Sequence, residues 1–241
     1  MTEVDQARIT SKGAHTIVAL DVSSGEEAIA LVENLAGLAG MFKVGLQLFL
    51  AEGPDIVRSI VDRGERVFLD LKLHDIPNTV AMAAVEAAKL GVSMLTIHGS
   101  GGREMVRATS EELQQRFGEE KPVVAVVTVL TSMNESDLAE TGVAGTPSEQ
   151  VFRLAAMGRD AGADGVICSP HEVSELRAHL GGSVKLVTPG VRMPGQSSDD
   201  QKRVATPSQA LRDGADWLVV GRYVNRSTEP REALLKVIAS L

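Results

Sequence analysis

Eight short runs of apolar and β-branched residues recur along the 241-residue chain. Most of these runs are apolar almost continuously, without the alternation of apolar and polar residues that marks a half-exposed strand. Strands buried on both faces of a parallel sheet have this pattern. The chain is therefore predicted to form eight parallel β-strands, at residues 16–22, 41–46, 66–72, 93–99, 123–130, 164–169, 185–190 and 217–222.

Helices are predicted between these runs, because apolar residues recur there at spacings of three and four. Ser24 with Glu27 has the pattern of a capping box, and Pro54 stands where another helix begins. Glycines at helix ends then lead directly into strands in three similar phrases, KLGVSMLTI, DAGADGVIC and RDGADWLVV. The chain thus alternates strand and helix throughout its length.

Eight strand-helix units fit either a closed (β/α)8 barrel or an open doubly wound sheet. The units average about 30 residues, and a barrel of this kind needs roughly 250 residues in all. No GxGxxG motif follows the first strand, as a dinucleotide-binding open sheet would require. We therefore predict an α/β fold, a single-domain (β/α)8 TIM barrel over residues 1–241, with residues 1–14 as a polar N-terminal extension.

The net charge and the cysteine content indicate which partners the protein can bind and where in the cell it is expected. The formal net charge is −8, and no Lys/Arg cluster has the character of a nucleic-acid footprint, so nucleic acid is not expected as a partner. Cys168 is the only cysteine, which fits a reducing cytoplasm. The first fifteen residues are polar and no apolar run reaches the length of a membrane span, so we expect a cytoplasmic protein without a membrane partner.

Ionisable residues gather at the predicted C-terminal ends of the strands, where a barrel of this kind holds its active site. Asp70 and Lys72 stand two residues apart on the third strand, so their side chains are expected to point the same way. Lys43 on the second strand and Asp75 after the third would add a further cation and anion. Flanking carboxylates favour the ammonium form of Lys72, which suits a general acid. Taken alone, Asp70 and Lys72 could also be a plain ion pair.

A second group of residues follows the last two strands. Gly221 and Arg222 end the eighth strand, where a backbone amide and a guanidinium can bind phosphate. Arg192 and Gln201 lie in the long polar loop at 189–203 and can close over the same phosphate. The alternative is that Gly221 only turns the chain and Arg222 is solvated. The histidines and the cysteine have no spacing typical of a metal site, so no metal ligand is predicted.

The stretch LDLKLHDIPNT at residues 69–79 resembles the Asp-x-Lys-x-x-Asp-Ile-Pro-Asn-Thr signature of the orotidine 5′-monophosphate decarboxylase family. ALDV, KVGLQLF, VTVLTSM, TPGVR with a downstream DQKR, and VVGR are similar to segments of its bacterial members, in the same order. The resemblance covers about residues 15–235. It implies a homodimeric enzyme that converts orotidine 5′-monophosphate to UMP and CO₂, the last step of UMP synthesis, without a cofactor or a metal.

The resemblance also implies a role for each site residue. The family places a Lys-Asp-Lys-Asp array at C6 of the pyrimidine, which corresponds here to Lys43, Asp70, Lys72 and Asp75. Lys72 would protonate C6 as CO₂ leaves, and Asp70 would face the substrate carboxylate. Asp75 and Thr79 would reach into the neighbouring subunit's site. The remaining contacts would be Asp21 and Lys43 to the ribose, Thr131 along the pyrimidine, and Arg192, Gln201, Gly221 and Arg222 to the phosphate.

Two alternatives remain open. Magnesium-dependent sugar-phosphate decarboxylases and hexulose-phosphate synthases of the same suprafamily share the Asp-x-Lys-x-x-Asp motif. They are expected to lack the Ile-Pro-Asn-Thr continuation and the LTSM stretch, both of which this chain contains. The other alternative is a non-catalytic nucleotide-binding barrel, which would normally have lost part of the charged array, whereas all four residues are present here.

Overall fold

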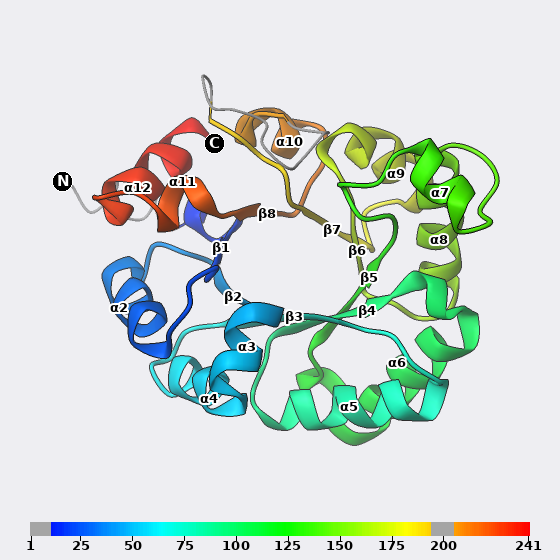
Figure 1. Ribbon diagram of the computed structural model, residues 1–241, viewed down its shortest axis with the longest axis horizontal. Helices are drawn as coiled ribbons and strands as arrows, with labels where there is room; N and C mark the ends of the chain where they lie inside the picture. Colours follow the sequence, from blue (N-terminus) through cyan, green and yellow to red (C-terminus); the bar gives the residue numbers. More distant parts are fainter. Residues whose placement is uncertain (1–10, 194–204) are drawn as a thin grey trace.

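The predicted strands close into a barrel in the computed structural model, which describes residues 11–193 and 205–241. Neighbouring strands follow one another in chain order, all pairs are parallel, and β8 closes on β1 (Figure 1). This closure confirms the (β/α)8 barrel and excludes the open sheet. The strands are β1 (Thr16–Ala19), β2 (Met41–Gly45), β3 (Val67–Leu73), β4 (Met94–His98), β5 (Val123–Val127), β6 (Gly165–Ile167), β7 (Lys185–Thr188) and β8 (Trp217–Val220).

Helices surround the strands on the outside of the barrel (Figure 1). The α-helices are α2 (Gly25–Leu35), α3 (Leu46–Glu52), α4 (Pro54–Val61), α5 (Pro77–Lys89), α6 (Arg103–Phe117), α7 (Glu135–Glu140), α8 (Pro147–Asp160), α9 (Val173–Leu180), α10 (Pro207–Arg212), α11 (Arg222–Asn225) and α12 (Pro230–Ser240). Short 3₁₀ helices are η1 (Gly99–Gly101), η2 (Gly118–Glu120) and η3 (Pro170–Glu172).

Two helix starts can be compared with the sequence patterns. Pro54 opens α4, as predicted. Ser24 caps α2, and its hydroxyl accepts a hydrogen bond from the Glu27 N–H at 3.2 Å. The carboxylate of Glu27 instead accepts from the backbone N–H of Ser23, one residue before the cap, at 3.4 Å. Half of the predicted capping box therefore forms, because the Glu27 side chain extends past its expected donor.

Several predicted strands run past the observed ends. β5 ends at Val127, although the apolar run continues to Leu130. Val129, beyond the end of the strand, is buried, and both Val129 and Leu130 line a cavity at the barrel mouth. Apolar residues that continue a strand pattern thus leave the sheet and form the wall of the cavity.

The barrel interior is filled by a layer of apolar side chains. Every member of the layer is at most 1% exposed. Phe68 of β3 also lines the cavity at the C-terminal ends of the strands, so the layer forms part of its floor. The layer consists of Ile17, Met41, Phe68, Met94, Ala125 and Val187. A close-packed floor of this kind holds the strand ends above it in fixed positions.

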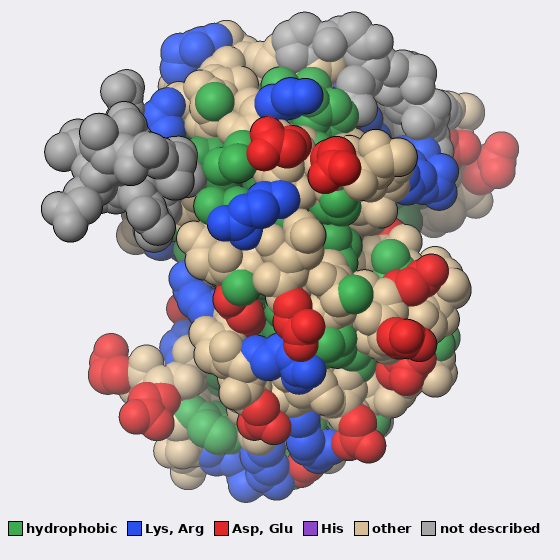
Figure 2. Space-filling view, turned by 90° about the vertical axis from the view of Figure 1, so that its left-hand side faces the viewer, with side chains coloured by type: hydrophobic (Ala, Val, Ile, Leu, Met, Phe, Trp, Pro, Cys, Tyr) green, Lys and Arg blue, Asp and Glu red, His purple; other side chains and the backbone are tan. Residues whose placement is uncertain are grey.

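The molecular surface carries both signs of charge. Figure 2 shows Lys/Arg and Asp/Glu side chains interspersed over one face. Some exposed charges form ion pairs, such as Arg63 with Glu33 at 3.0 Å. In the described ranges, no helix is both long enough and apolar enough to cross a membrane.

Part of the predicted N-terminal extension, 1–14, falls on described residues. Residues 1–10 lie outside them, but Gly13 is buried against the barrel, and its carbonyl accepts a hydrogen bond from the Thr16 hydroxyl at 2.7 Å. A Cβ at Gly13 would lie 2.1 Å from the carbonyl oxygen of Leu38. The last residues of the predicted extension therefore pack against the N-terminal face of the barrel.

Two aspartates at this N-terminal face connect neighbouring strands by hydrogen bonds. Asp216 precedes β8 in the phrase RDGADWLVV, and its carboxylate accepts from the backbone N–H of Leu186 at 2.8 Å and from Arg177 at 2.5 Å. Asp164 stands at the same place in DAGADGVIC and accepts from the backbone N–H of Val124 at 2.9 Å. Each aspartate thus ties the start of its own strand to the preceding strand. This contact accounts for the aspartate in two of the repeated phrases.

We predict that Asp216→Ala lowers the free energy of unfolding by about 2 kcal/mol, because the Leu186 N–H and the Arg177 guanidinium, both partly buried, lose their acceptor. The control is Asp55→Ala, which breaks an exposed ion pair with Arg58 and should cost about 0.5 kcal/mol or less. Urea unfolding followed by circular dichroism measures both variants. Equal losses for the two would contradict the assigned role.

Candidate active site

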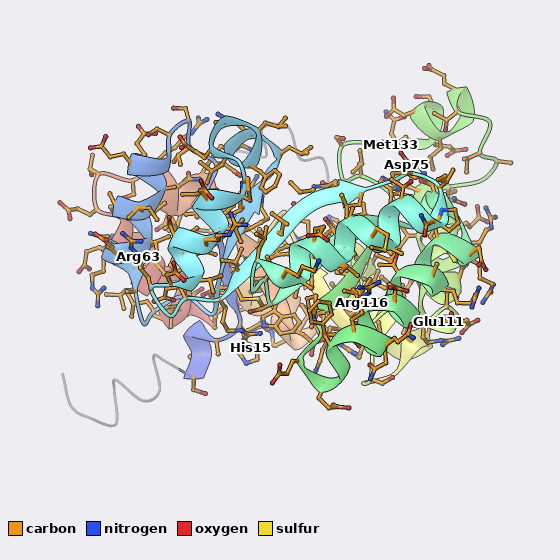
Figure 3. The ribbon with its side chains drawn as sticks, turned by 90° about the horizontal axis from the view of Figure 1, so that it is seen from below. His15, Arg63, Asp75, Glu111, Arg116 and Met133 are labelled. Atoms are coloured by element: carbon orange, nitrogen blue, oxygen red, sulfur yellow. The ribbon has the colours of Figure 1, made fainter. Side chains whose placement is uncertain are left out.

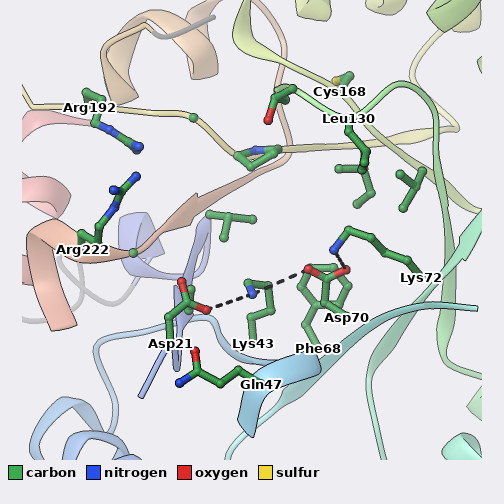
Figure 4. Close-up of a pocket in the computed structure, with 18 of the residues that line it drawn as sticks. Asp21, Lys43, Gln47, Phe68, Asp70, Lys72, Leu130, Cys168, Arg192 and Arg222 are labelled. Atoms are coloured by element: carbon green, nitrogen blue, oxygen red, sulfur yellow. Dashed lines mark hydrogen bonds and ion pairs between the residues drawn. The ribbon is translucent and has the colours of Figure 1, made fainter. Parts of the chain in front are cut away.

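A cavity of about 480 Å³ lies at the C-terminal ends of the strands (Figure 4). Its apolar lining includes Phe68, Ile167 and Val219, from β3, β6 and β8. Its charged lining consists of two aspartates and five cations: Asp21, Asp70, Lys43, Lys72, Arg192, Arg222 and Arg226. A cavity of this volume can enclose a small organic molecule. The excess of cations favours an anionic one, although the chain as a whole is acidic.

Most of the predicted site residues meet in this cavity. The members that line it are Asp21, Lys43, Asp70, Lys72, Thr131, Arg192, Gly221 and Arg222. Asp75 and Thr79 do not line it and are exposed. Gln201 and most of the predicted loop 189–203 fall outside the described residues.

Four charged side chains alternate in sign along one wall (Figure 4). Lys43 Nζ lies 3.4 Å from Asp21 Oδ1 and 3.6 Å from Asp70 Oδ2. Lys72 Nζ lies 2.8 Å from Asp70 Oδ1. The side chains of Lys43 and Asp70 are only 12% and 13% exposed. Within a single chain, therefore, Asp21 rather than Asp75 completes the alternating array.

The two lysines keep Asp70 ionised in spite of its burial. Burial raises the pKa of the Asp70 carboxyl, but the charges of Lys43 and Lys72 lower it, as do hydrogen bonds from Lys72 and Thr96. The lowering effects prevail, so the pKa lies below its ordinary value. A buried carboxylate is thus fixed as an anion in the middle of the array.

Lys72 owes its position to an irregularity in β3. The β3–β4 register passes from Leu69↔Leu95 to Leu73↔Ile97, so three residues of β3 stand opposite Thr96 alone. Lys72 has φ 51°, the only positive φ at a non-glycine residue within 11–193 and 205–241. Such a backbone costs on the order of 1 kcal/mol. A regular strand was expected here, but the structure has a bulge, from which Lys72 Nζ reaches Asp70 Oδ1 at 2.8 Å.

Arginines gather at the other end of the cavity. Figure 4 shows the side chains of Arg192 and Arg222 pointing toward each other at the end of the cavity opposite Lys72. Gly221 precedes α11, and a Cβ there would lie 3.7 Å from Asp21 Oδ2, inside the lining. Guanidinium groups and an unobstructed backbone suit a phosphate. Arg222 is half-buried beside the cavity, so the alternative of a merely solvated side chain loses support.

Three residues of the site escaped the sequence-based prediction. A Cβ at Gly45 would lie 3.1 Å from Lys43 Nζ, so the glycine leaves room for that ammonium group. Thr96 bonds both Asp70 and Lys72. Arg226 lies four residues after Arg222 and adds a cation to the lining. A glycine inside a strand and a polar residue inside the apolar run MLTIH were the available signals for the first two.

Asp75 and Thr79 lie at the rim of the barrel, at the start of α5. Asp75 Oδ1 accepts a hydrogen bond from the Ile76 N–H at 2.6 Å. Figure 3 places Asp75 at the end of the molecule opposite His15, which precedes β1. Ile76, next to Asp75, is 67% exposed. This part of the rim therefore presents charged and apolar side chains outward.

The described residues contain no group of three or more His, Cys, Asp or Glu side chains arranged to hold a metal ion. Beside the array, the rings of His74 and His98 stack with their centroids 5.2 Å apart. His98 Nδ1 forms a 2.7 Å hydrogen bond with the Ser100 hydroxyl. Burial, followed by the charges of His74 and Lys72, lowers the pKa of His98. These effects favour the neutral form of the His98 imidazole.

Comparison with known proteins identifies the family. The protein-family model described as "Orotidine 5'-phosphate decarboxylase / HUMPS family" matches residues 15–237. The orotidine 5′-phosphate decarboxylase from Chromobacterium violaceum is 47% identical, over 95% of this chain and 91% of its own length. The orotidine 5′-phosphate decarboxylase from Geotalea daltonii is 46% identical, over 98% of this chain and 98% of its own length. The crystal structure of orotidine 5′-phosphate decarboxylase from Lactobacillus acidophilus matches with a TM-score of 0.83 and 36% identity, over 93% of this chain and 97% of that one. The chain therefore belongs to the orotidine 5′-phosphate decarboxylase / HUMPS family.

Proposed function

We propose that the protein decarboxylates orotidine 5′-monophosphate to UMP and CO₂ without a cofactor, in pyrimidine nucleotide synthesis. The observation that carries the proposal is the array of Asp21, Lys43, Asp70 and Lys72 in a cavity whose far end holds arginines. The names of the curated relatives support the same substrate. A substrate with a carboxylate at one end and a phosphate at the other matches this distribution of charge.

The chemical step needs a proton donor next to the carbon that loses CO₂. The bond from C6 to the carboxylate carbon breaks, and its electron pair stays on C6. Lys72 Nζ then donates a proton to C6 and later regains one from solvent. An ammonium about 4 Å from the developing carbanion stabilises it by about 4 kcal/mol at an effective dielectric constant of 20. Lys72 is suited to this role because Asp70 Oδ1 already orients its amine at 2.8 Å.

Asp70 acts at the same carbon. Its ionised carboxylate faces the substrate carboxylate, and this repulsion disappears as CO₂ departs. Asp70 also holds both lysines, since its Oδ1 meets Lys72 and its Oδ2 faces Lys43. The proposal thus assigns Asp70 two tasks, positioning the cations and disfavouring the bound carboxylate.

The other site residues are assigned to the parts of the substrate that do not react. Thr131 lies along the pyrimidine, over the apolar floor. Attraction to a distant phosphate can orient the reacting ring, because binding energy from remote groups is used at the reacting centre. The contacts are assigned as Asp21 and Lys43 to the ribose, and Arg192, Gln201, Gly221 and Arg222 to the phosphate.

We infer a homodimer in which Asp75 and Thr79 enter the partner's site. In the single chain both residues are exposed and neither lines the chain's own cavity. Apolar residues are exposed beside them, Ile76 at 67% and Met82 at 37%. A second copy that covers this rim would bury these apolar side chains and bring a further carboxylate to the array.

We predict that the purified enzyme forms UMP from orotidine 5′-monophosphate in excess chelator, with no added cofactor. The array contains its own proton donor, so no metal is needed for the proposed step. Product formation is followed by chromatography, and a parallel reaction contains added Mg²⁺. An absolute requirement for Mg²⁺, or turnover of a sugar phosphate instead, would favour the magnesium-dependent relatives. Binding without turnover would favour a non-catalytic barrel.

We predict that two inactive variants, Asp70→Ala and Asp75→Ala, recover activity when they are unfolded together and refolded as a mixture. A mixed dimer has one site with both aspartates intact, so about a quarter of wild-type activity is expected from random pairing. The control mixture, Asp70→Ala with Lys72→Ala, should stay inactive because each of its sites lacks one of these residues. Equal activity of the two mixtures would refute the shared site.

A further inference from the structure

Thr96 stands at the centre of the irregular part of the barrel. It belongs to β4 and is 1% exposed. In the β3–β4 register it is the only β4 residue between the Leu69↔Leu95 and Leu73↔Ile97 pairs, opposite the stretch that contains Asp70 and Lys72. Any group that stabilises the bulge from the β4 side must therefore come from this residue.

The Thr96 hydroxyl makes two hydrogen bonds at once. Its oxygen accepts from the backbone N–H of Lys72 at 2.9 Å. The same hydroxyl donates to Asp70 Oδ1 at 3.0 Å. A hydroxyl can do both because it has one proton and two lone pairs, whereas an ionised carboxylate can only accept. The direction of both bonds is therefore determined.

The first bond replaces one that a regular ladder would supply. A bulge leaves backbone groups without their usual partners in the neighbouring strand. The Lys72 N–H, which belongs to a residue with φ 51°, finds the Thr96 side chain instead. This contact stabilises the backbone conformation from which the Lys72 side chain starts.

The second bond fixes the carboxylate. Asp70 Oδ1 then receives two donors, Lys72 Nζ at 2.8 Å and the Thr96 hydroxyl at 3.0 Å, while Oδ2 faces Lys43. With both oxygens engaged, the carboxylate cannot rotate without losing at least one of these contacts. Its hydrogen bond from Thr96 also contributes to the lowered pKa of Asp70.

We propose that Thr96 is a positioning residue, whose hydroxyl holds the Lys72 backbone and the Asp70 carboxylate in one fixed arrangement. The catalytic meaning of that arrangement rests on the proposed decarboxylation. The arrangement itself does not, because it follows from the two hydrogen bonds between β3 and β4. Thr96 acts through its two neighbours and does not line the cavity.

The test compares Thr96→Val, which keeps the branched shape and removes the hydroxyl, with Thr96→Ser, which keeps the hydroxyl. Enzyme with ¹³C-labelled aspartate carboxyl groups is titrated by NMR, and the Asp70 signal is assigned through Asp70→Asn. The pKa of Asp70 should rise in Thr96→Val and stay at the wild-type value in Thr96→Ser. If Thr96→Val does not fold, Thr96→Ala takes its place.

The matched control is Thr109→Val. Thr109 is also fully buried, but its hydroxyl bonds the Met105 carbonyl at 2.8 Å within α6 and does not reach the cavity. This variant should leave the titration of Asp70 unchanged. An unchanged Asp70 pKa in Thr96→Val, or equal shifts in Thr96→Val and Thr96→Ser, would overturn the proposal, because the hydroxyl would then have no specific effect.

Kinetics provide the second readout. We predict that kcat for decarboxylation falls by about 10-fold to 100-fold in Thr96→Val with less than about a threefold change in KM, and that Thr96→Ser restores most of it. A fall in kcat that Thr96→Ser fails to restore argues against the hydroxyl. If the wild-type enzyme does not turn over orotidine 5′-monophosphate, the proposed function fails, while the NMR titration still decides the role of Thr96.

Discussion

The buried carboxylate of Asp70 is the group on which the rest of the site depends. It stands between two ammonium groups, with Lys72 at 2.8 Å and Lys43 at 3.6 Å. Without this anion, two cations would share a poorly solvated space and repel each other, an arrangement that costs several kcal/mol. Without the cations, burial would raise the pKa of the Asp70 carboxyl. The carboxylate and the two ammonium groups therefore stabilise one another.

The barrel makes this arrangement possible because the C-terminal ends of its parallel strands lie side by side at one end. β1, β2 and β3 are hydrogen-bonded neighbours, and Asp21, Lys43 and Asp70 lie in or just after them. The packed apolar layer in the barrel interior, which includes Phe68, leaves no space there for these charged side chains. The bulge in β3 then turns the Lys72 backbone, at a cost that the surrounding sheet can absorb.

Much of this architecture could be predicted from the sequence. Continuous apolar runs identified all eight strands, because burial on both faces leaves a simple pattern. Strand ends pointed to Asp70 and Lys72, and these two residues do meet. The assumption of a regular strand was nevertheless wrong, because no local pattern in LDLKL signals a bulge that depends on a neighbouring strand. For the same reason, Thr96 could be noticed as polar but not linked to its two partners.

Other features could not be derived from local sequence at all. The fourth member of the array within one chain is Asp21, which stands 49 residues before Asp70 and meets Lys43 through the parallel pairing of β1 with β2. The exposure of Asp75 depends on where α5 starts on the rim. Both are consequences of long-range packing rather than of residue type.

The central claim is that Lys72 delivers the proton to C6, and Lys72→Ala tests it most directly. The measurement compares kcat for UMP formation with the dissociation constant of UMP in the variant and the wild type. The account predicts that kcat falls by about 100-fold to 10,000-fold, as expected for loss of a general acid. The dissociation constant of UMP should change by less than about 10-fold. Near-normal turnover in Lys72→Ala would contradict the account.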